Sequence, residues 1–248
     1  MTRLSTRPAR LGAPAAAAVV ALALSAFSCG DATGAGGDGV SQLWRTPLDD
    51  RFATSDERPA TDGERVYAIA GGMVTLDADT GGVLWTRALS QTVPRNAVVR
   101  GGRVMAAEGI AFALDAATGA ELWRFTPEAH GGFGESAVDD HAFYFGTAAH
   151  RLHALDQETG RALWTVDLGP DWRHTGVVTG VAVSGDTVYA AAERYDSPNG
   201  NLSSGFLFAV DRATGRILWS FRNGTGADER NVSASPAVAG NVLVAGDL

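Results

Sequence analysis

The amino-acid sequence predicts an all-β protein, a β-propeller of four-stranded antiparallel blades. The phrase Asp-x-x-Thr-Gly-x-x-x-Trp occurs four times, with steps of 38, 41 and 55 residues between Asp77, Asp115, Asp156 and Asp211. Two-residue turn signals recur upstream of each copy, and the chain holds 31 glycines but only 19% charged residues. A period of about 40 residues with four short strands in each unit is typical of a propeller blade.

Each copy of the phrase predicts a tight turn between the third and fourth strands of a blade. The Asp and Thr side chains bond to nearby backbone groups, and the Gly adopts the positive φ that closes a bulged hairpin. The Trp then falls on the fourth strand, where a large ring fills the space between neighbouring sheets. We expect these residues to hold the fold rather than bind a ligand. They are Asp77, Gly81, Trp85, Asp115, Gly119, Trp123, Asp156, Gly160, Trp164, Asp211, Gly215 and Trp219.

The inner two strands of each blade are predicted from short apolar runs on either side of a turn signal. The turn signals are Asp62-Gly63, Gly101-Gly102, Asp139-Asp140, Ser184-Gly185 and Ala239-Gly240. After Trp219 the chain begins a fifth repeat with two predicted strands, 235–238 and 241–245. The sequence therefore predicts four complete blades and part of a fifth. We interpret it as a fragment of a seven- or eight-bladed propeller, whose missing blades come from a longer chain or another copy.

The repeat also carries a family resemblance. Ala-Leu-Asp-x-x-Thr-Gly-x-x-Leu-Trp, found at Ala113–Trp123 and Ala154–Trp164, resembles the repeat of quinoprotein alcohol dehydrogenase-like (PQQ-repeat) β-propellers. The resemblance extends over residues 43–248 and implies the propeller fold. It does not fix a function, because this superfamily includes both quinone-dependent dehydrogenases and the non-enzymatic BamB-like lipoprotein branch.

The amino-terminal segment predicts export. Residues 1–28 have a basic start and an apolar stretch over 11–27, as a signal peptide does. Cys29, the one cysteine, stands where a bacterial lipoprotein signal places its lipidated residue, and residues 29–42 are a Gly-rich tether. We expect an extracytoplasmic protein that meets the membrane through a lipid anchor only. The alternative is an ordinary secretory signal followed by an incidental cysteine.

The candidate binding face lies on the loops. Loops that follow each fourth strand, and those between second and third strands, share one side of a propeller. On this side the sequence places Trp172, Arg173, His174 and Tyr195. The long third step is explained by an insertion over residues 193–205, which we expect to project as a loop. The alternative for Trp172 is packing over the edge of an adjacent blade.

Composition and motifs exclude several functions. A net charge of −8, with a pI near 5.1 and no basic stripe, argues against a nucleic-acid partner. His150 and His153 would point to opposite faces of a strand, which argues against a shared metal. No catalytic, cofactor-binding or metal-binding residue is identified, and a lone cysteine excludes an internal disulfide.

Three functions remain open at this stage. The preferred one is a non-enzymatic, membrane-anchored scaffold that binds other envelope proteins through its loop face and needs no cofactor. The resemblance also implies an alternative, a fragment of a PQQ-dependent alcohol or sugar dehydrogenase, which would hold pyrroloquinoline quinone and calcium at the central axis. A third possibility is an extracytoplasmic propeller that binds a small ligand or a polysaccharide.

Overall fold

The computed structural model describes residues 42–48, 58–89, 94–128, 134–169, 176–195, 202–223, 235–239 and 242–245. They form four sheets of four antiparallel strands and one sheet of two strands, which confirms the predicted all-β propeller with four blades and the start of a fifth. Within these ranges the structure shows no helix of the length and apolarity needed to cross a membrane.

The strands follow one another in each blade in chain order. Blade 1 comprises β1 (Ala60–Thr61), β2 (Arg65–Ile69), β3 (Met73–Asp77) and β4 (Val83–Arg87). Blade 2 comprises β5 (Val98–Arg100), β6 (Arg103–Glu108), β7 (Ile110–Asp115) and β8 (Glu121–Phe125). Blade 3 comprises β9 (Ala137–Val138), β10 (Ala142–Gly146), β11 (Arg151–Asp156) and β12 (Ala162–Asp167). Blade 4 comprises β13 (Gly176–Ser184), β14 (Thr187–Tyr195), β15 (Leu202–Asp211) and β16 (Ile217–Asn223), and the fifth sheet β17 (Ala237–Ala239) and β18 (Val242–Val244).

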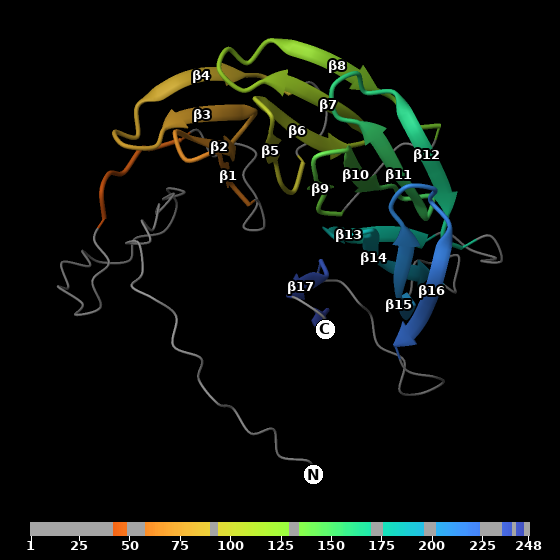
Figure 1. Ribbon diagram of the computed structural model, residues 1–248. Coiled ribbons are helices and arrows are strands. Elements are labelled where there is room, and N and C mark those ends of the chain that lie inside the picture. Colours follow the sequence, from red (N-terminus) through yellow and green to blue (C-terminus); the bar gives the residue numbers. More distant parts are fainter. Residues whose placement is uncertain are drawn as a thin grey trace.

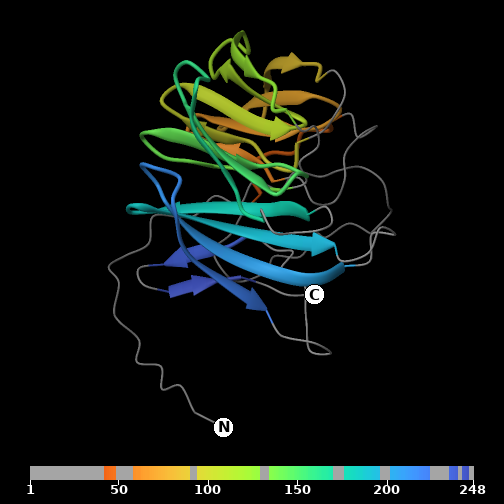
Figure 2. The same ribbon diagram turned by 90° about the vertical axis from the view of Figure 1, so that its right-hand side faces the viewer.

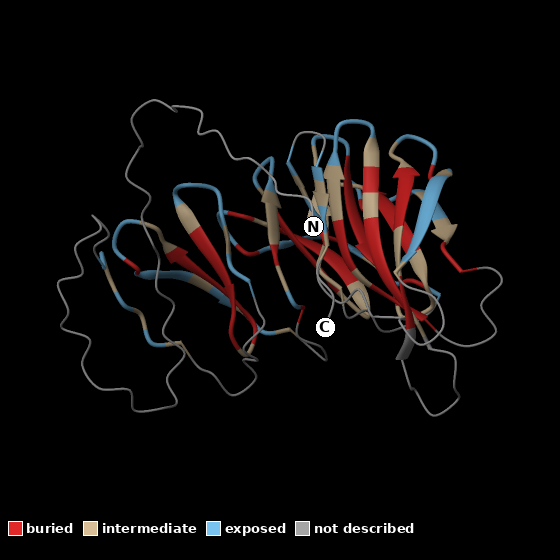
Figure 3. Cartoon of the chain, turned by 90° about the horizontal axis from the view of Figure 1, so that it is seen from below, coloured by how far each residue is buried: buried red, intermediate tan, exposed pale blue. Residues whose placement is uncertain are grey.

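The blades lie side by side along an arc, with first strands on the inner side and fourth strands on the outer side (Figure 1). Turned by 90°, the four blades appear stacked, and the β17–β18 pair lies beside blade 4 (Figure 2). The middle strands are buried along most of their length, whereas exposed residues collect in the turns and on the outer strands (Figure 3). Middle strands are apolar on both faces because a neighbouring blade covers each face.

The repeated turn has the geometry that its residues predict. In blade 3, Asp156 Oδ1 accepts hydrogen bonds from the Thr159 amide and the Thr159 hydroxyl, both at 2.8 Å. The Gly160 amide donates to the Asp156 carbonyl at 2.8 Å, and Gly160 has a φ of +70°. A β-bulge shifts the register between Ala154 and Leu155. Blades 1, 2 and 4 have the same bulge at the corresponding position.

The seams between blades are built from one repeated contact. In blades 1 to 3, the tryptophan of the fourth strand lies against the turn glycine of the next blade, and its indole nitrogen donates to a carbonyl in that turn. The pairs are Trp85 on Gly119, Trp123 on Gly160 and Trp164 on Gly215, with donation to Ala116, Gln157 and Arg212 at 3.1, 3.0 and 2.8 Å. Residues 42–48, which belong to no sheet, make the same contact with blade 1, where Trp44 lies on Gly81 and donates to Ala78 at 2.7 Å.

The insertion in blade 4 differs from its prediction. We expected residues 193–205 to project as a loop, but β14 continues to Tyr195 and β15 begins at Leu202, and Glu193 pairs with Gly205. Only residues 196–201 of this insertion fall outside the described ranges. The extra residues lengthen the β14–β15 hairpin, because Arg194 pairs with Ser204 and Tyr195 with Leu202 in the continued ladder.

Candidate binding face

The structure places the two ends of the loop that carries the candidate binding residues. Strand β12 ends at Asp167 and β13 begins at Gly176. Trp172, Arg173 and His174 lie between these strands, outside the described residues. Tyr195 is the last residue of β14, and its side chain also lies outside them. Their role in binding therefore stays a prediction.

His150 connects both ends of this loop. Its Nδ1 lies 2.7 Å from Asp167 Oδ1, and its carbonyl accepts a hydrogen bond from the Leu168 amide at 2.9 Å. Its own amide donates to the Gly176 carbonyl at 3.1 Å. It is also the one non-glycine residue of the described ranges with a positive φ, +47°. His150 thus precedes β11 rather than sharing a strand with His153, and it fixes where the 167–176 loop leaves and rejoins the sheet.

Hydrogen bonds connect the inner strands at the loop-face end of the central axis. The Arg58 amide donates to the Arg95 carbonyl at 2.9 Å, and the Asn96 side chain pairs with the Ser136 backbone at 2.9 and 3.0 Å. The Arg58 guanidinium reaches past blade 2 and pairs with Glu135 of blade 3 at 3.1 Å. These contacts hold adjacent blades at a fixed spacing and so give the loops a rigid base.

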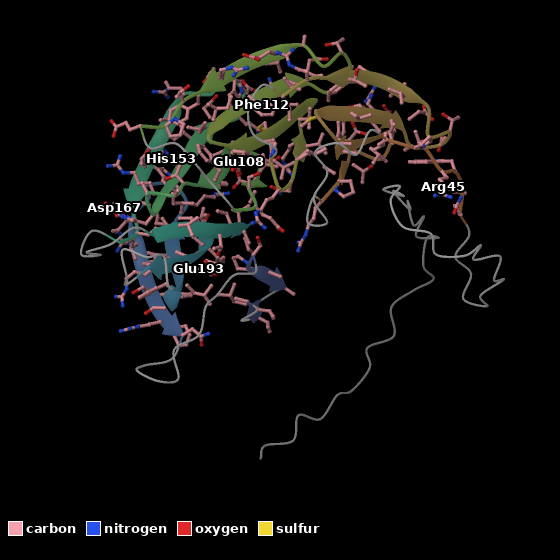
Figure 4. All side chains as sticks on the ribbon, turned by 180° about the vertical axis from the view of Figure 1, so that it is seen from behind. Arg45, Glu108, Phe112, His153, Asp167 and Glu193 are labelled. Atoms are coloured by element: carbon pink, nitrogen blue, oxygen red, sulfur yellow. The ribbon has the colours of Figure 1, made fainter. Side chains whose placement is uncertain are left out.

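Two carboxyl groups, one buried on Glu193 and one partly buried on Glu108, lie near the same end of the blades. Burial raises the pKa of Glu108, at the end of β6, to about 7, and the charge of Arg95 offsets part of that shift. Burial also raises the pKa of Glu193 on β14, and Arg95 again acts in the opposite direction. Figure 4 shows Glu108 on blade 2, His153 on blade 3 and Glu193 on blade 4. The charge of Arg95 therefore acts on the pKa of both acids.

Two arginines of blade 4 converge at its loop-face end. Arg194 and Arg222 donate to the buried hydroxyl of Ser204 at 3.2 and 3.0 Å. Both guanidinium groups also lie over the Phe206 ring, at 5.5 and 5.9 Å from its centre. Sequence reasoning missed this group. Only the strand register, which sets Arg194 opposite Ser204 and Phe206 opposite Arg222, reveals that the four side chains share one face.

On the opposite side of the propeller, the turn face, ion pairs join adjacent blades. Arg100 of blade 2 pairs with Asp140 of blade 3, and Arg212 of blade 4 pairs with Asp139 of blade 3 at 3.2 Å. Between outer strands, Arg87 of blade 1 pairs with Glu121 of blade 2 at 2.8 Å. The four turn aspartates have pKa values held below their ordinary range by the Thr hydroxyl and then by backbone amides. Such carboxylates serve the turn, not proton transfer.

A quinone site with calcium would need several carboxylate or other oxygen ligands at the axis. In the part of the chain that the structure describes, no three His, Cys, Asp or Glu side chains gather as metal ligands. The described residues do not fit such a site.

Comparison with known proteins decides the family. A family model described as outer membrane protein assembly factor BamB matches residues 35–112 and 107–247. The chain belongs to the BamB family. No curated protein matches it individually.

Solved structures agree with the fold of a BamB-family propeller. Quinohemoprotein alcohol dehydrogenase from Comamonas testosteroni is 20% identical, with a TM-score of 0.57 over 77% of this chain and 39% of that one. A europium-containing methanol dehydrogenase is 17% identical, with a TM-score of 0.51 over 68% of this chain and 42% of that one. BamB from Moraxella catarrhalis is 22% identical, with a TM-score of 0.48 over 77% and 68%. The chain thus spans about two fifths of either dehydrogenase, and at these identities the likeness concerns the fold alone.

Proposed function

We propose that this chain is a non-enzymatic propeller scaffold that binds other envelope proteins through its loop face. The observation that carries the proposal is the BamB family match over residues 35–247. Because that family is named for outer membrane protein assembly, the partners we propose are proteins of that assembly machinery. The membrane attachment that we propose is a lipid on Cys29, after removal of residues 1–28 as a signal peptide and with residues 29–42 as a tether.

The rigidity of its base supports the loop face as the binding surface. The loop face carries loops of different lengths on this rigid base. Contacts between the inner strands, such as Asn96 with Ser136, hold that base. A rigid base lowers the entropy cost of ordering a binding surface.

The function that we propose involves neither pyrroloquinoline quinone nor calcium. The repeated aspartates are engaged by their own turns, as Asp156 is by the Thr159 hydroxyl. The candidate contact residues remain Trp172, Arg173, His174 and Tyr195.

Site-specific photo-crosslinking tests the proposal. A photoreactive amino acid placed at Trp172 samples the loop face, and the same amino acid at Ala117, which is exposed in a turn of blade 2, is the matched control on the turn face. We expect adducts with outer-membrane assembly proteins, identified by mass spectrometry, from position 172 only. Equal adducts from both positions, or none from position 172, would contradict a binding role of the loop face.

A further inference from the structure

The long β14–β15 hairpin of blade 4 brings two positive charges together. Strand β14 has nine residues, whereas β2, β6 and β10, the second strands of blades 1 to 3, have five or six. The added length carries Arg194, which lies opposite Ser204. On the next strand, Arg222 lies opposite Phe206. The register thus places both arginines at the same end of one sheet.

Each guanidinium of this pair is held by the same two neighbours. Arg194 and Arg222 both donate from Nη2 to Ser204 Oγ, at 3.2 and 3.0 Å, so the two nitrogen atoms lie no more than about 6 Å apart. Both guanidinium groups also lie over the Phe206 ring, whose face attracts a cation. We call Arg194, Ser204, Phe206 and Arg222 the arginine cluster.

The arginine cluster lies on the loop face, at the seam between blades 3 and 4. Phe206 packs against a hydrophobic cluster that includes Leu168, the residue that follows β12. Arg194 is half-buried beside Tyr195, and Arg222 is exposed, so a ligand reaches the cluster from solvent. The cluster therefore adjoins both segments in which the candidate contact residues fall.

We propose that the arginine cluster binds a carboxylate in an acidic segment of a partner protein. A carboxylate accepts charge-assisted hydrogen bonds of about 2.7 to 2.9 Å at each of its two oxygens, and the planar guanidinium matches this geometry. Nitrogen atoms no more than about 6 Å apart can each donate to one oxygen of the same carboxylate. This inference rests on the function proposed above, for which it names the chemistry of the partner.

The charge of the whole molecule favours a peptide carboxylate over a polyanionic surface. The chain has a net charge of −8, which repels an anionic membrane or a nucleic acid, since each presents many charges at once. An acidic segment presents few charges, and exposed charges farther away than about 8 to 10 Å are screened at physiological salt. Ser204 and Phe206 also hold both guanidinium groups before binding, which lowers the entropy cost of the contact.

A labelled peptide tests the site without the natural partner. The probe is a short fluorescent peptide of alternating Asp and Gly with an amidated carboxyl end, and the control peptide has Asn in place of Asp. Titrating the full chain into the Asp peptide should raise its fluorescence anisotropy to a plateau. The Asn peptide should bind at least about tenfold more weakly, because it has no charged oxygen to offer.

Protein variants locate the binding. Arg194→Gln and Arg222→Gln should each weaken binding of the Asp peptide by about tenfold, with a melting temperature close to that of the parent for Arg222→Gln, since Arg222 is exposed. Arg216→Gln is the matched control, because it removes the same charge from an exposed position at the turn-face end of the same blade, and it should bind like the parent.

Three results would overturn the proposal. They are absence of saturable binding of the Asp peptide, equal weakening in Arg222→Gln and Arg216→Gln, and binding to phosphatidylglycerol vesicles, lost in Arg222→Gln, by a chain that does not bind the Asp peptide. The last result would mean that a membrane occupies the cluster. Crosslinking from position 172 tests the proposed function separately, so adducts there without binding of the Asp peptide would overturn this inference alone.

Discussion

The indole of Trp123 lies against Gly160 of the next blade, so closely that a Cβ on Gly160 would come within 2.6 Å of Trp123 Cδ2. The same indole donates a hydrogen bond to the Gln157 carbonyl at 3.0 Å, in the turn that contains Gly160. One contact thus joins two features of the repeat, the tryptophan of one blade and the glycine of another. The stability of each seam depends on both residues.

Removal of a seam tryptophan should be costly. Trp123 is 7% exposed and its ring lies 6.2 Å from that of Phe143 in blade 3. Trp123→Ala should lower the free energy of unfolding by about 3 to 5 kcal/mol, the range for emptying a large aromatic site. Trp219→Ala is the matched control and should cost on the order of 1 kcal/mol, because that side chain is half exposed. Denaturant unfolding measures both, and equal losses would contradict the seam argument.

The turn glycine should be as sensitive as the tryptophan. Gly160→Ala adds both a Cβ against Trp123 and strain at a φ of +70°. Gly185 has a φ of +57° with nothing within 4 Å of its Cβ position, so Gly185→Ala introduces the backbone strain alone, about 1 to 2 kcal/mol. The excess loss in Gly160→Ala over Gly185→Ala, measured by thermal melts, reports the steric contact. No excess would mean that the indole moves aside freely.

The sequence predicted the regular part of this molecule because each blade repeats the same local rules. The Asp-x-x-Thr-Gly phrase specifies a bulged turn by its own hydrogen bonds, and the bulge sets the register that brings Trp164 to Gly215. The length of the β14–β15 hairpin was predicted wrongly because the turn residues at 196–200 mark only its tip. The group formed by Arg194, Ser204 and Arg222 depends on the register between three consecutive strands, which no local pattern encodes.

Acid should destabilise the protein partly through His153. This side chain is 5% exposed and stacks on Phe145 at 4.9 Å, and burial lowers the pKa of His153 to about 4. The folded state keeps the ring neutral while the unfolded chain takes up a proton below about pH 6.5. Stability is therefore lost as the pH falls from about 6.5 to about 4, by up to about 3 kcal/mol.

His153→Phe should remove that part of the acid sensitivity. Melting temperatures at pH 7.5 and pH 4.5 should differ less in this variant than in the parent. His141→Gln is the control, because His141 is exposed in a turn, and it should keep the parent's acid sensitivity. A parent-like acid loss in His153→Phe would show that other groups account for it.

Cys29→Ser tests the proposed membrane attachment. A lipoprotein's several acyl chains hold firmly to a membrane, whereas a single chain does not. The serine variant should therefore move from the membrane fraction to the soluble extracytoplasmic fraction, as followed by fractionation and immunoblotting. Equal membrane association of parent and variant would favour an ordinary secretory signal with an incidental cysteine.

Titration with pyrroloquinoline quinone and calcium tests most directly whether this propeller is a scaffold rather than an oxidoreductase. The cofactor requires a bound metal and convergent ligands, and the described side chains form no such group. Following the cofactor's absorbance, we expect no saturable change and no alcohol-dependent dye reduction. Stoichiometric binding at micromolar concentration, together with alcohol-dependent dye reduction, would contradict the scaffold and establish the dehydrogenase.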